Sequence, residues 1–438
     1  MSSTLPNTEK PETVPQQKLR LQTFTALQHR NFRLLWISLI VSSVGTWMQI
    51  VAQALLVLQI THGSALALGI VALAQSSSFF LFALVGGSVA DRVDKRRFLL
   101  MTQSLSMCLA FLLGILTLTG VIQVWMVVLL AFCSGTVLSF DQPTRSSLIP
   151  MLVPRKDLMN AISLQSTVFN GAAVLGPALA GIAIGSLANA GRLLGLTGPY
   201  TGYAGNFFLN GISFLGVLFV LYFIQVPQEA IEQSTEKRGP MLDAIRAALG
   251  AVKRDPALPW VLSGYGALLF FGPSNTLLLP IFATQILHLN AFQLGLLFSA
   301  SGLGTLIGAL TIASLGDFKY KGSLLLVSLF LWTSALIVFA FSRVLWLSLL
   351  ALLLFGIAQN GVGATVITLA QLRVPPQMRG RVMSLNTLLI MGVRPLGDFP
   401  ASGMIALVGG PLTVLICAAI VGAYSFYLLI GKPVIRAL

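Results

Sequence analysis

Two pairs of oppositely charged side chains are the residues of this 438-residue chain whose types and spacing could do chemistry. Arg394 and Asp398 lie four residues apart, as do Asp141 and Arg145, and a proline falls inside each interval. Residues four apart share one face of a helix, so each pair can meet. A carboxylate beside an arginine in a low dielectric stays ionised until a proton or an organic cation competes for it. Each pair could therefore couple a proton to a solute, or it could be a permanent ion pair that holds helices together.

The sequence around these charges is almost entirely apolar. Hydrophobic residues make up 56% of the chain and charged residues 9%, whereas a soluble domain is about a quarter charged. Residues 34–90 and 98–140 contain no Asp, Glu, Lys or Arg. Each run is about twice the roughly 20 residues that cross a bilayer as a helix. The composition predicts an all-α integral membrane protein, in which ionisable residues inside helices are functional candidates because lipid disfavours them.

Breaks at glycine, proline and charged clusters predict twelve transmembrane helices. The expected spans are 34–60, 67–90, 98–119, 122–150, 159–188, 202–225, 258–285, 292–315, 322–341, 344–372, 382–408 and 411–431. The longest hydrophilic stretch divides them into two six-helix bundles, residues 31–225 and 258–431, joined by a cytoplasmic linker over 226–257. Residues 1–30 are expected to be a disordered cytoplasmic tail without a signal peptide, and residues 432–438 a second cytoplasmic tail.

The formal net charge of +14 reflects topology. In the predicted arrangement, 24 of the 27 Lys and Arg residues fall on the side of the two termini, and Arg192 and Arg343 fall on the opposite side. Basic residues concentrate in cytoplasmic loops, so both termini are expected in the cytoplasm and the protein in the cell (inner or plasma) membrane. The basic charge is thereby accounted for, and no nucleic-acid partner is expected.

The two halves also show signs of an internal repeat. A shift of 221 residues superposes Val153-Pro154 on Val374-Pro375, and Leu175-Gly176 on Leu396-Gly397. Both matches fall near the loop between the fourth and fifth helix of a half. Many transporters are built from such repeats, so the two bundles are expected to be pseudo-symmetric.

One charged loop carries the first resemblance to a known family. The run from Gly87 to Arg97 is similar to the loop between helices 2 and 3 of the major facilitator superfamily. The resemblance covers about residues 30–431 and implies the major facilitator fold. It also implies that Gly87, Asp91, Arg92 and Arg96 form a gating loop, which latches the cytoplasmic side shut in the outward-facing state. On the other interpretation, the basic residues of this loop only set topology.

A second motif lies in the fifth helix. Residues 170–181, with Gly171, Gly176, Pro177 and Gly181, resemble the Gly/Pro motif of superfamily exporters that exchange solute for protons. Small residues and a missing backbone donor permit close packing and a bend, although any bundle in lipid also needs tight packing. Residues 32–47 and 63–69 resemble the enterobactin-exporter and macrolide-efflux branch.

The chain departs from the family pattern at three places. Ala131 stands where many proton-coupled exporters have an arginine in the fourth helix, and Thr46 where the branch often has an acidic residue. Residues 316–321, which match the charged loop in the second half, lack its arginine cluster. The fold is unaffected, but the family's usual scheme of proton coupling does not carry over directly.

Polar side chains are expected to line a cavity between the halves. The residues named for substrate binding or coupling, besides the two charged pairs, are Thr46, Gln49, Gln53, Asn275, Gln359 and Asn360. Amides that both donate and accept hydrogen bonds suit a large, oxygen-rich, mostly uncharged solute. Hydrogen bonding between helices explains each of them equally well.

The function predicted from these features is secondary active transport. We expect export of a small organic solute, such as a drug, siderophore or secondary metabolite, by proton antiport with alternating access. The alternatives are a proton-coupled uptake symporter and a non-transporting sensor or scaffold. No enzyme is expected, because HExxH, nucleophile-elbow and P-loop patterns do not occur. No metal or cofactor is expected either. The proton gradient would supply the energy, with lipids, protons and the solute as partners of a functional monomer.

Overall fold

The computed structural model describes most of the chain. The described residues are 24–90, 93–195, 198–224, 249–250, 252–316, 319–375, 378–379, 382–383, 385–386, 389–436 and 438. Asp91 and Arg92 of the expected gating loop lie outside them, as do most of the expected linker and residues 1–23 of the expected tail. All regular elements in the described ranges are helical. The predicted all-α fold is therefore confirmed.

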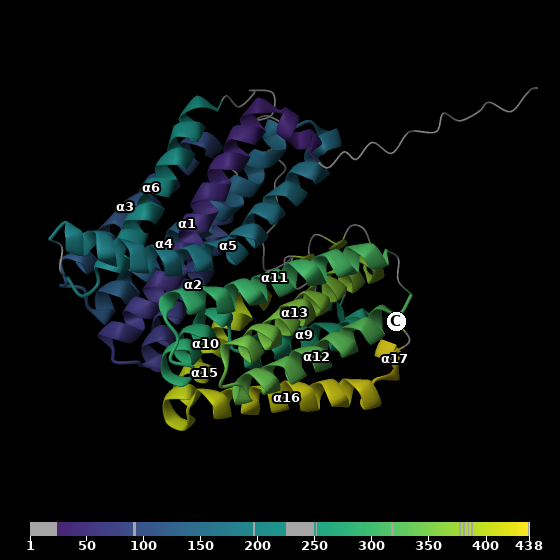
Figure 1. Ribbon diagram of the computed structural model, residues 1–438. Helices are drawn as coiled ribbons and strands as arrows, with labels where there is room; N and C mark the ends of the chain where they lie inside the picture. The colour runs from purple at the N-terminus through teal and green to yellow at the C-terminus, as the bar shows by residue number, and fades with distance from the viewer. Residues whose placement is uncertain are drawn as a thin grey trace, which may run out of the picture.

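Six long helices form the first half of the described chain. They are α1 (Arg30–Ile60), α2 (Ala65–Ala90), α3 (Lys95–Leu118), α4 (Val124–Leu152), α5 (Leu158–Leu193) and α6 (Thr201–Phe223), with short 3-10 turns η1 (Thr25–Gln28) and η2 (Arg155–Asp157). Helix α2 packs on α4, α3 packs on α6, and α1 packs on both α5 and α6. The result is one bundle, as the sequence predicts (Figure 1).

The second half is built from more fragments. It comprises α9 (Leu258–Phe271), α10 (Asn275–Ile281), the π-turn η3 (Phe282–Ile286), α11 (Ala291–Leu315), α12 (Lys321–Phe341), α13 (Leu345–Arg373), the π-turn η4 (Leu389–Val393), α15 (Arg394–Val408), α16 (Gly410–Gly431) and α17 (Pro433–Arg436). Across the described residues, 11 helical stretches are long and apolar enough to cross a membrane. The remaining expected span, 382–408, is described chiefly by η4 and α15. Helix α17 lies within the expected C-terminal tail.

The span expected over 258–285 is broken in its middle. Helix α9 ends at Phe271, Gly272 and Pro273 interrupt it, and α10 begins after Ser274. Proline lacks an N–H and disfavours helical backbone in the residue before it, so a helix ends readily at this point. The Ser274 side chain then caps α10 by accepting a hydrogen bond from the Leu277 N–H. Polar backbone groups are thereby placed in the interior of the protein.

Among the described elements, two helix pairs make the most extensive contacts between the bundles, and the first is α5 with α11. A Cβ atom on Gly181 would overlap the backbone of Ala291, and one on Gly295 would overlap the backbone of Pro177. The Ser299 hydroxyl donates a hydrogen bond of 2.5 Å to the Val174 carbonyl. Glycine is required here because the two backbones approach too closely for a side chain. We call this contact the α5–α11 seam.

The second pair is α2 with α15, and it closes the same end of the molecule. We name that end the far side, and the end where α1 begins and α16 ends the termini side. A Cβ atom on Gly69 would overlap the Ser402 side chain. At the far-side helix ends, the Gln285 amide donates a 2.6 Å hydrogen bond to the Gly63 carbonyl. From these contacts α5 and α11 diverge towards the termini side (Figure 1).

On the termini side, each bundle is held together internally by a contact between a carboxylate and a basic side chain. His29 Nε2 lies 2.9 Å from Asp157 Oδ2, and Arg373 Nε lies 2.9 Å from Asp255 Oδ2. Partial burial favours the neutral form of the Asp255 carboxyl. Hydrogen bonds from two backbone N–H groups and from Arg373 outweigh this effect, so the pKa of Asp255 lies below its usual value. The ion pair ties the start of α9 to the end of α13.

Substitution of a seam glycine should destabilise this arrangement. Gly181→Ala forces α5 away from α11, and overpacking of this kind costs about 1–3 kcal/mol. We expect a lower melting temperature for the purified protein in detergent. Gly185→Ala is the matched control on the same helix, because nothing lies within 4 Å of a Cβ atom there. Equal melting temperatures for the two variants would contradict the close approach of α5 and α11.

The ion pair between Asp255 and Arg373 predicts a pH dependence of stability. Asp255→Asn keeps an oxygen for the backbone hydrogen bonds but loses the ion pair with Arg373. Because the folded pKa is depressed, the stabilisation is complete above the usual value of about 3.9 and is lost as the pH falls through the folded pKa. The variant should therefore melt lower than the wild type at pH 7, and this difference should shrink below about pH 4. A constant difference across that range would show that the ion pair contributes nothing.

Candidate functional site: a cavity between the two bundles

A cavity of about 430 Å³ lies between the two bundles. Three helices of the first bundle and four of the second contribute to it. Its lining residues are Trp47, Ala72, Gln75, Ser76, Phe169, Asn170, Ala173, Ser274, Asn275, Thr276, Phe298, Ser301, Gly302, Thr305, Gln359, Arg394, Pro395 and Asp398. Ligand sites of transporters occur at such an interface. A larger hollow of about 710 Å³ is open, lies at helix ends and is lined mainly by apolar residues such as Ile70 and Trp125, so it is a poorer candidate.

The break between α9 and α10 supplies much of the polar wall. Ser274, Asn275 and Thr276 follow the break and all line the cavity. The Asn275 amide donates a 2.7 Å hydrogen bond to Ser301 on α11, while its Oδ1 atom is buried and has no hydrogen-bond partner among the described residues. A buried acceptor of this kind favours a ligand or water that donates a hydrogen bond.

Aromatic side chains form part of the wall contributed by the first bundle. The rings of Trp47 on α1 and Phe169 on α5 meet edge to face, with centroids 6.1 Å apart. Phe298 on α11 also lines the cavity. Flat apolar surfaces beside a few placed polar groups are typical of sites for drug-sized organic molecules.

The charged residues of α15 both line the cavity, but they do not contact each other. Asp398 is 5% exposed and accepts a 2.7 Å hydrogen bond from the Ser274 backbone N–H. The described residues show no ion pair between Asp398 and Arg394, although one helical turn separates them. Arg394 is partly exposed, and no hydrogen bond or carboxylate within 4.0 Å is described for it, although its charge acts on Asp398 over a longer distance. The Asp398 carboxylate instead binds the backbone N–H of Ser274, immediately before α10.

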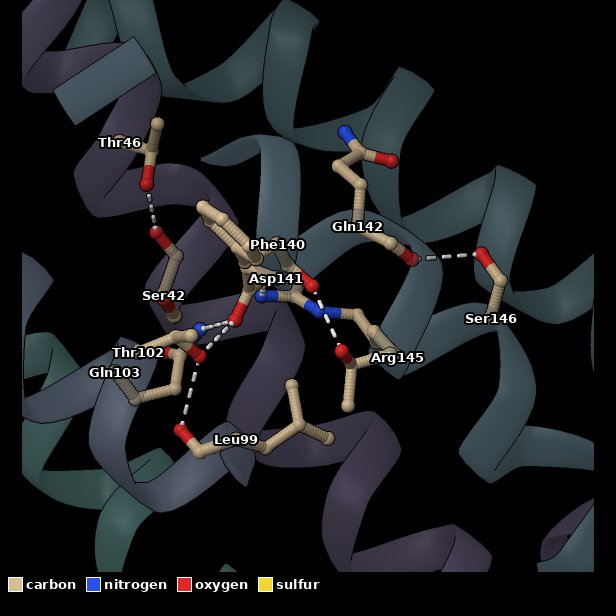
Figure 2. A network of polar contacts seen from close by, with 11 residues as sticks. Ser42, Thr46, Leu99, Thr102, Gln103, Phe140, Asp141, Gln142, Arg145 and Ser146 are labelled. Atoms are coloured by element: carbon tan, nitrogen blue, oxygen red, sulfur yellow. Dashed lines mark hydrogen bonds and ion pairs between the residues drawn. The ribbon is translucent and has the colours of Figure 1, made fainter. Parts of the chain in front are cut away.

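The second charged pair forms a closed network within the first bundle (Figure 2). Asp141 on α4 is 3% exposed, and its Oδ2 atom lies 2.6 Å from Arg145 Nη2. Its Oδ1 atom accepts hydrogen bonds from Thr102 at 2.9 Å and from Gln103 at 2.6 Å, both on α3. Neither Asp141 nor Arg145 lines the cavity. This geometry ties α3 to α4.

The six uncharged polar candidates divide into two groups. Asn275 and Gln359 line the cavity, whereas Thr46, Gln49, Gln53 and Asn360 do not. The Thr46 hydroxyl donates to the Ser42 carbonyl at 2.9 Å, and Gln49 accepts from Asn210 on α6 at 2.7 Å. For Thr46 and Gln49 the described hydrogen bonds therefore lie within the first bundle.

The described part of the expected gating loop has a packing role. Gly87 lies within α2, near its end. The Arg96 side chain donates to the carbonyls of Leu221, at 2.7 Å, and Tyr222. These carbonyls belong to the last turn of α6, where a helix carries partial negative charge and unpaired acceptors. Arg96 thereby holds the end of α6 against the start of α3.

The glycines of the Gly/Pro motif occupy different surroundings. A Cβ atom on Gly176 would lie 2.5 Å from the Trp47 Cβ atom, and Gly181 faces α11 across the seam. At Gly171 nothing lies within 4 Å of such an atom. A Cβ atom on Gly295 would overlap the Pro177 carbonyl oxygen, so the backbone of Pro177 packs directly against Gly295 of α11. The motif therefore positions α5 against both α1 and α11.

Several residues that line the cavity were not predicted from the sequence. Ser274, Thr276 and Ser301 were not among the candidates, nor were Phe169 and Asn170. The signal for the first two was Gly272-Pro273, which interrupts an otherwise continuous apolar span. Ser301 has no comparable signal, because a serine inside a transmembrane helix usually bonds to its own backbone.

Comparisons with known proteins identify the family. A family model described as transmembrane secretion effector, of the major facilitator superfamily, matches residues 21–433. The chain is 26% identical over 401 residues to the enterobactin exporter EntS of Citrobacter koseri, covering 90% of this chain and 89% of that protein. The matched relatives are transporters.

Solved structures show the same fold. A bacterial homologue of the human lysosomal transporter Spinster, inward-facing and occupied, has a TM-score of 0.71 at 16% identity, covering 93% of this chain and 98% of that one. The nucleoside transporter NupG has a TM-score of 0.67 at 14% identity, with 91% and 98% covered. The predicted resemblance is confirmed, and the chain belongs to the transmembrane secretion effector family of major facilitator superfamily transporters.

Proposed function

We propose that this protein exports a small organic solute in exchange for protons, by alternating access of the cavity between its two bundles. The observation that carries this proposal is the cavity itself, which has one tightly packed end. Glycine-mediated seams close its far side, while α5 and α11 diverge towards the termini side. A carrier must hold its solute between two halves that can rock about such seams.

The charge distribution and the matched relatives support the proposed direction of transport. Basic residues concentrate on the termini side, which supports a cytoplasmic location of both termini in the cell membrane. The cavity then faces the cytoplasm, from which an exporter loads. The relatives matched over most of the chain are named as enterobactin exporters, which favours export over uptake.

Asp398 is the proposed proton carrier. It lines the cavity, and its described hydrogen-bond partner is one residue, Ser274. Asp141, by contrast, is held by three side chains away from the cavity. A proton that neutralises Asp398 weakens hydrogen bonds from one residue and the attraction to Arg394, whereas a proton on Asp141 disrupts a buried network of three side chains. Proton exchange with the cavity therefore favours Asp398.

Helix α10 can transmit a change at Asp398 to the far side. Its first turn is held by Asp398 through Ser274, and it also contacts α1 and α2 of the first bundle. Leu277 and Ile281 on α10 are buried together with first-bundle residues such as Leu56 and Leu68. Release of Ser274 would therefore loosen an element that packs across the bundle interface.

The proposal predicts substrate-dependent proton release. In energised inverted vesicles that contain the protein, addition of the exported solute should collapse part of the proton gradient, as measured with a pH-sensitive fluorescent dye. Dyes, macrolides and catecholate siderophores form the panel, and vesicles without the protein are the control. Solute-driven proton movement in the opposite sense would indicate uptake by symport. Absence of any response, together with absence of solute accumulation, would overturn transport by this cavity.

Substitution of Asp398 and substitution of Asp141 should have different effects on proton coupling and on stability. Asp398→Asn keeps an oxygen for the Ser274 N–H but cannot exchange a proton, so proton release should fall to the level of protein-free vesicles while thermal stability is retained. Asp141→Asn weakens the pair with Arg145, so the melting temperature should fall while the surviving protein still couples. Melting curves and proton release are measured on both variants. Normal coupling in Asp398→Asn would remove it as the proton carrier.

A further inference from the structure

We infer that the solute is an organic anion whose charged group binds Arg394. The inference rests on the proposed function and names the substrate class of the same cavity. The sequence alone favours a mostly uncharged solute, because amide side chains are expected in the cavity and Arg394 can pair with Asp398. In the described structure Arg394 lines the cavity without a close ion pair, which favours an anion instead.

The first observation is the availability of Arg394. It begins α15, lines the cavity and is partly exposed. In the described structure no carboxylate lies within 4.0 Å of its guanidinium group, and no hydrogen bond engages it. Arginine stays protonated at all relevant pH values and binds carboxylates and phosphates with a planar fork of donors. The charge of Arg394 acts on Asp398, but no close ion pair or hydrogen bond is described for it, so its guanidinium donors can still bind an anion.

The second observation is that the acidic residue in the cavity lining, Asp398, is almost completely buried. Of the α-helices described, only α4 and α15 carry an acidic residue, Asp141 and Asp398 respectively. Asp141 is 3% exposed, forms an ion pair with Arg145 and lies outside the cavity lining. Asp398 is 5% exposed, and its Oδ1 atom accepts the Ser274 N–H. Of the two charged residues in the cavity lining, Arg394 is therefore the more exposed one.

The remaining walls define the rest of the solute. Trp47 and Phe169 offer aromatic faces from the first bundle, and Asn275 Oδ1 is a buried acceptor without a described partner. A volume of about 430 Å³ suits a drug-sized molecule. The fitting solute is an acid that also carries an aromatic ring and a hydroxyl or N–H donor.

The test uses three probes of nearly equal size and different charge. They are naphthalene-2-carboxylate, naphthalene-2-carboxamide and 2-naphthylmethylammonium, titrated calorimetrically at pH 7 into the purified full-length protein. We expect the carboxylate to bind at least about tenfold more tightly than the other two, the effect of one charge-assisted contact. Arg394→Gln should remove that preference, and Arg394→Lys should retain most of it.

Arg343→Gln is the matched control, because it removes a positive charge from a site outside the cavity. The Arg343 side chain donates to the Ala340 and Ser342 carbonyls at the end of α12. The preference of the Arg343→Gln variant for the carboxylate probe should equal that of the wild type. Melting curves of all variants establish that they are folded.

Three results would overturn the anion assignment: tighter or equal binding of the amide or the ammonium probe, an unchanged preference in Arg394→Gln, or no binding of the carboxylate. Different results would contradict the anion assignment and the proposed function. Proton release driven by a cationic or neutral solute would overturn the anion and leave antiport standing. Arg394-dependent binding of the carboxylate without transport of any solute would support the anion site and overturn export.

Discussion

The interior of a membrane offers no water to a charge, and the placement of the few charges in this protein follows from that constraint. A charged or polar group without a partner in such a medium costs several kcal/mol. Asp141 meets this requirement with three side-chain partners, and Asp398 meets it with a buried backbone N–H at the break in a helix. Arg394 lies in the wall of the cavity, where its charge acts on Asp398 but no hydrogen bond or close ion pair is described for it.

The broken helix connects the site to the seams. Proline and glycine interrupt one span at cavity depth, so backbone donors face a carboxylate of α15. Continuous helices would leave Asp398 without this donor. The second fragment, α10, then packs on the first bundle near the far side, where glycines bring α5 and α11 into backbone contact. Chemistry in the cavity and closure of one end therefore depend on the same short element.

The sequence predicted the membrane class and the helix spans because these depend on local apolarity and charge. It also identified Asn275, Gln359, Arg394 and Asp398, all of which line the cavity. It could not assign partners, because these depend on how helices from distant parts of the chain rotate against each other. Gln49 bonds to Asn210, 161 residues away, and Asp398 bonds to Ser274, 124 residues away. No spacing rule within one helix predicts such contacts.

The arginine in the cavity wall also bears on energetics. A carrier that moves a solute with one negative charge outward while a proton moves inward displaces two charges in the same electrical sense. A membrane potential that is negative inside then drives both movements, at about 2.3 kcal/mol per charge for each 100 mV. A single fixed guanidinium group that selects anions would thus let the electrical part of the gradient concentrate the solute outside, even where the pH difference across the membrane is small.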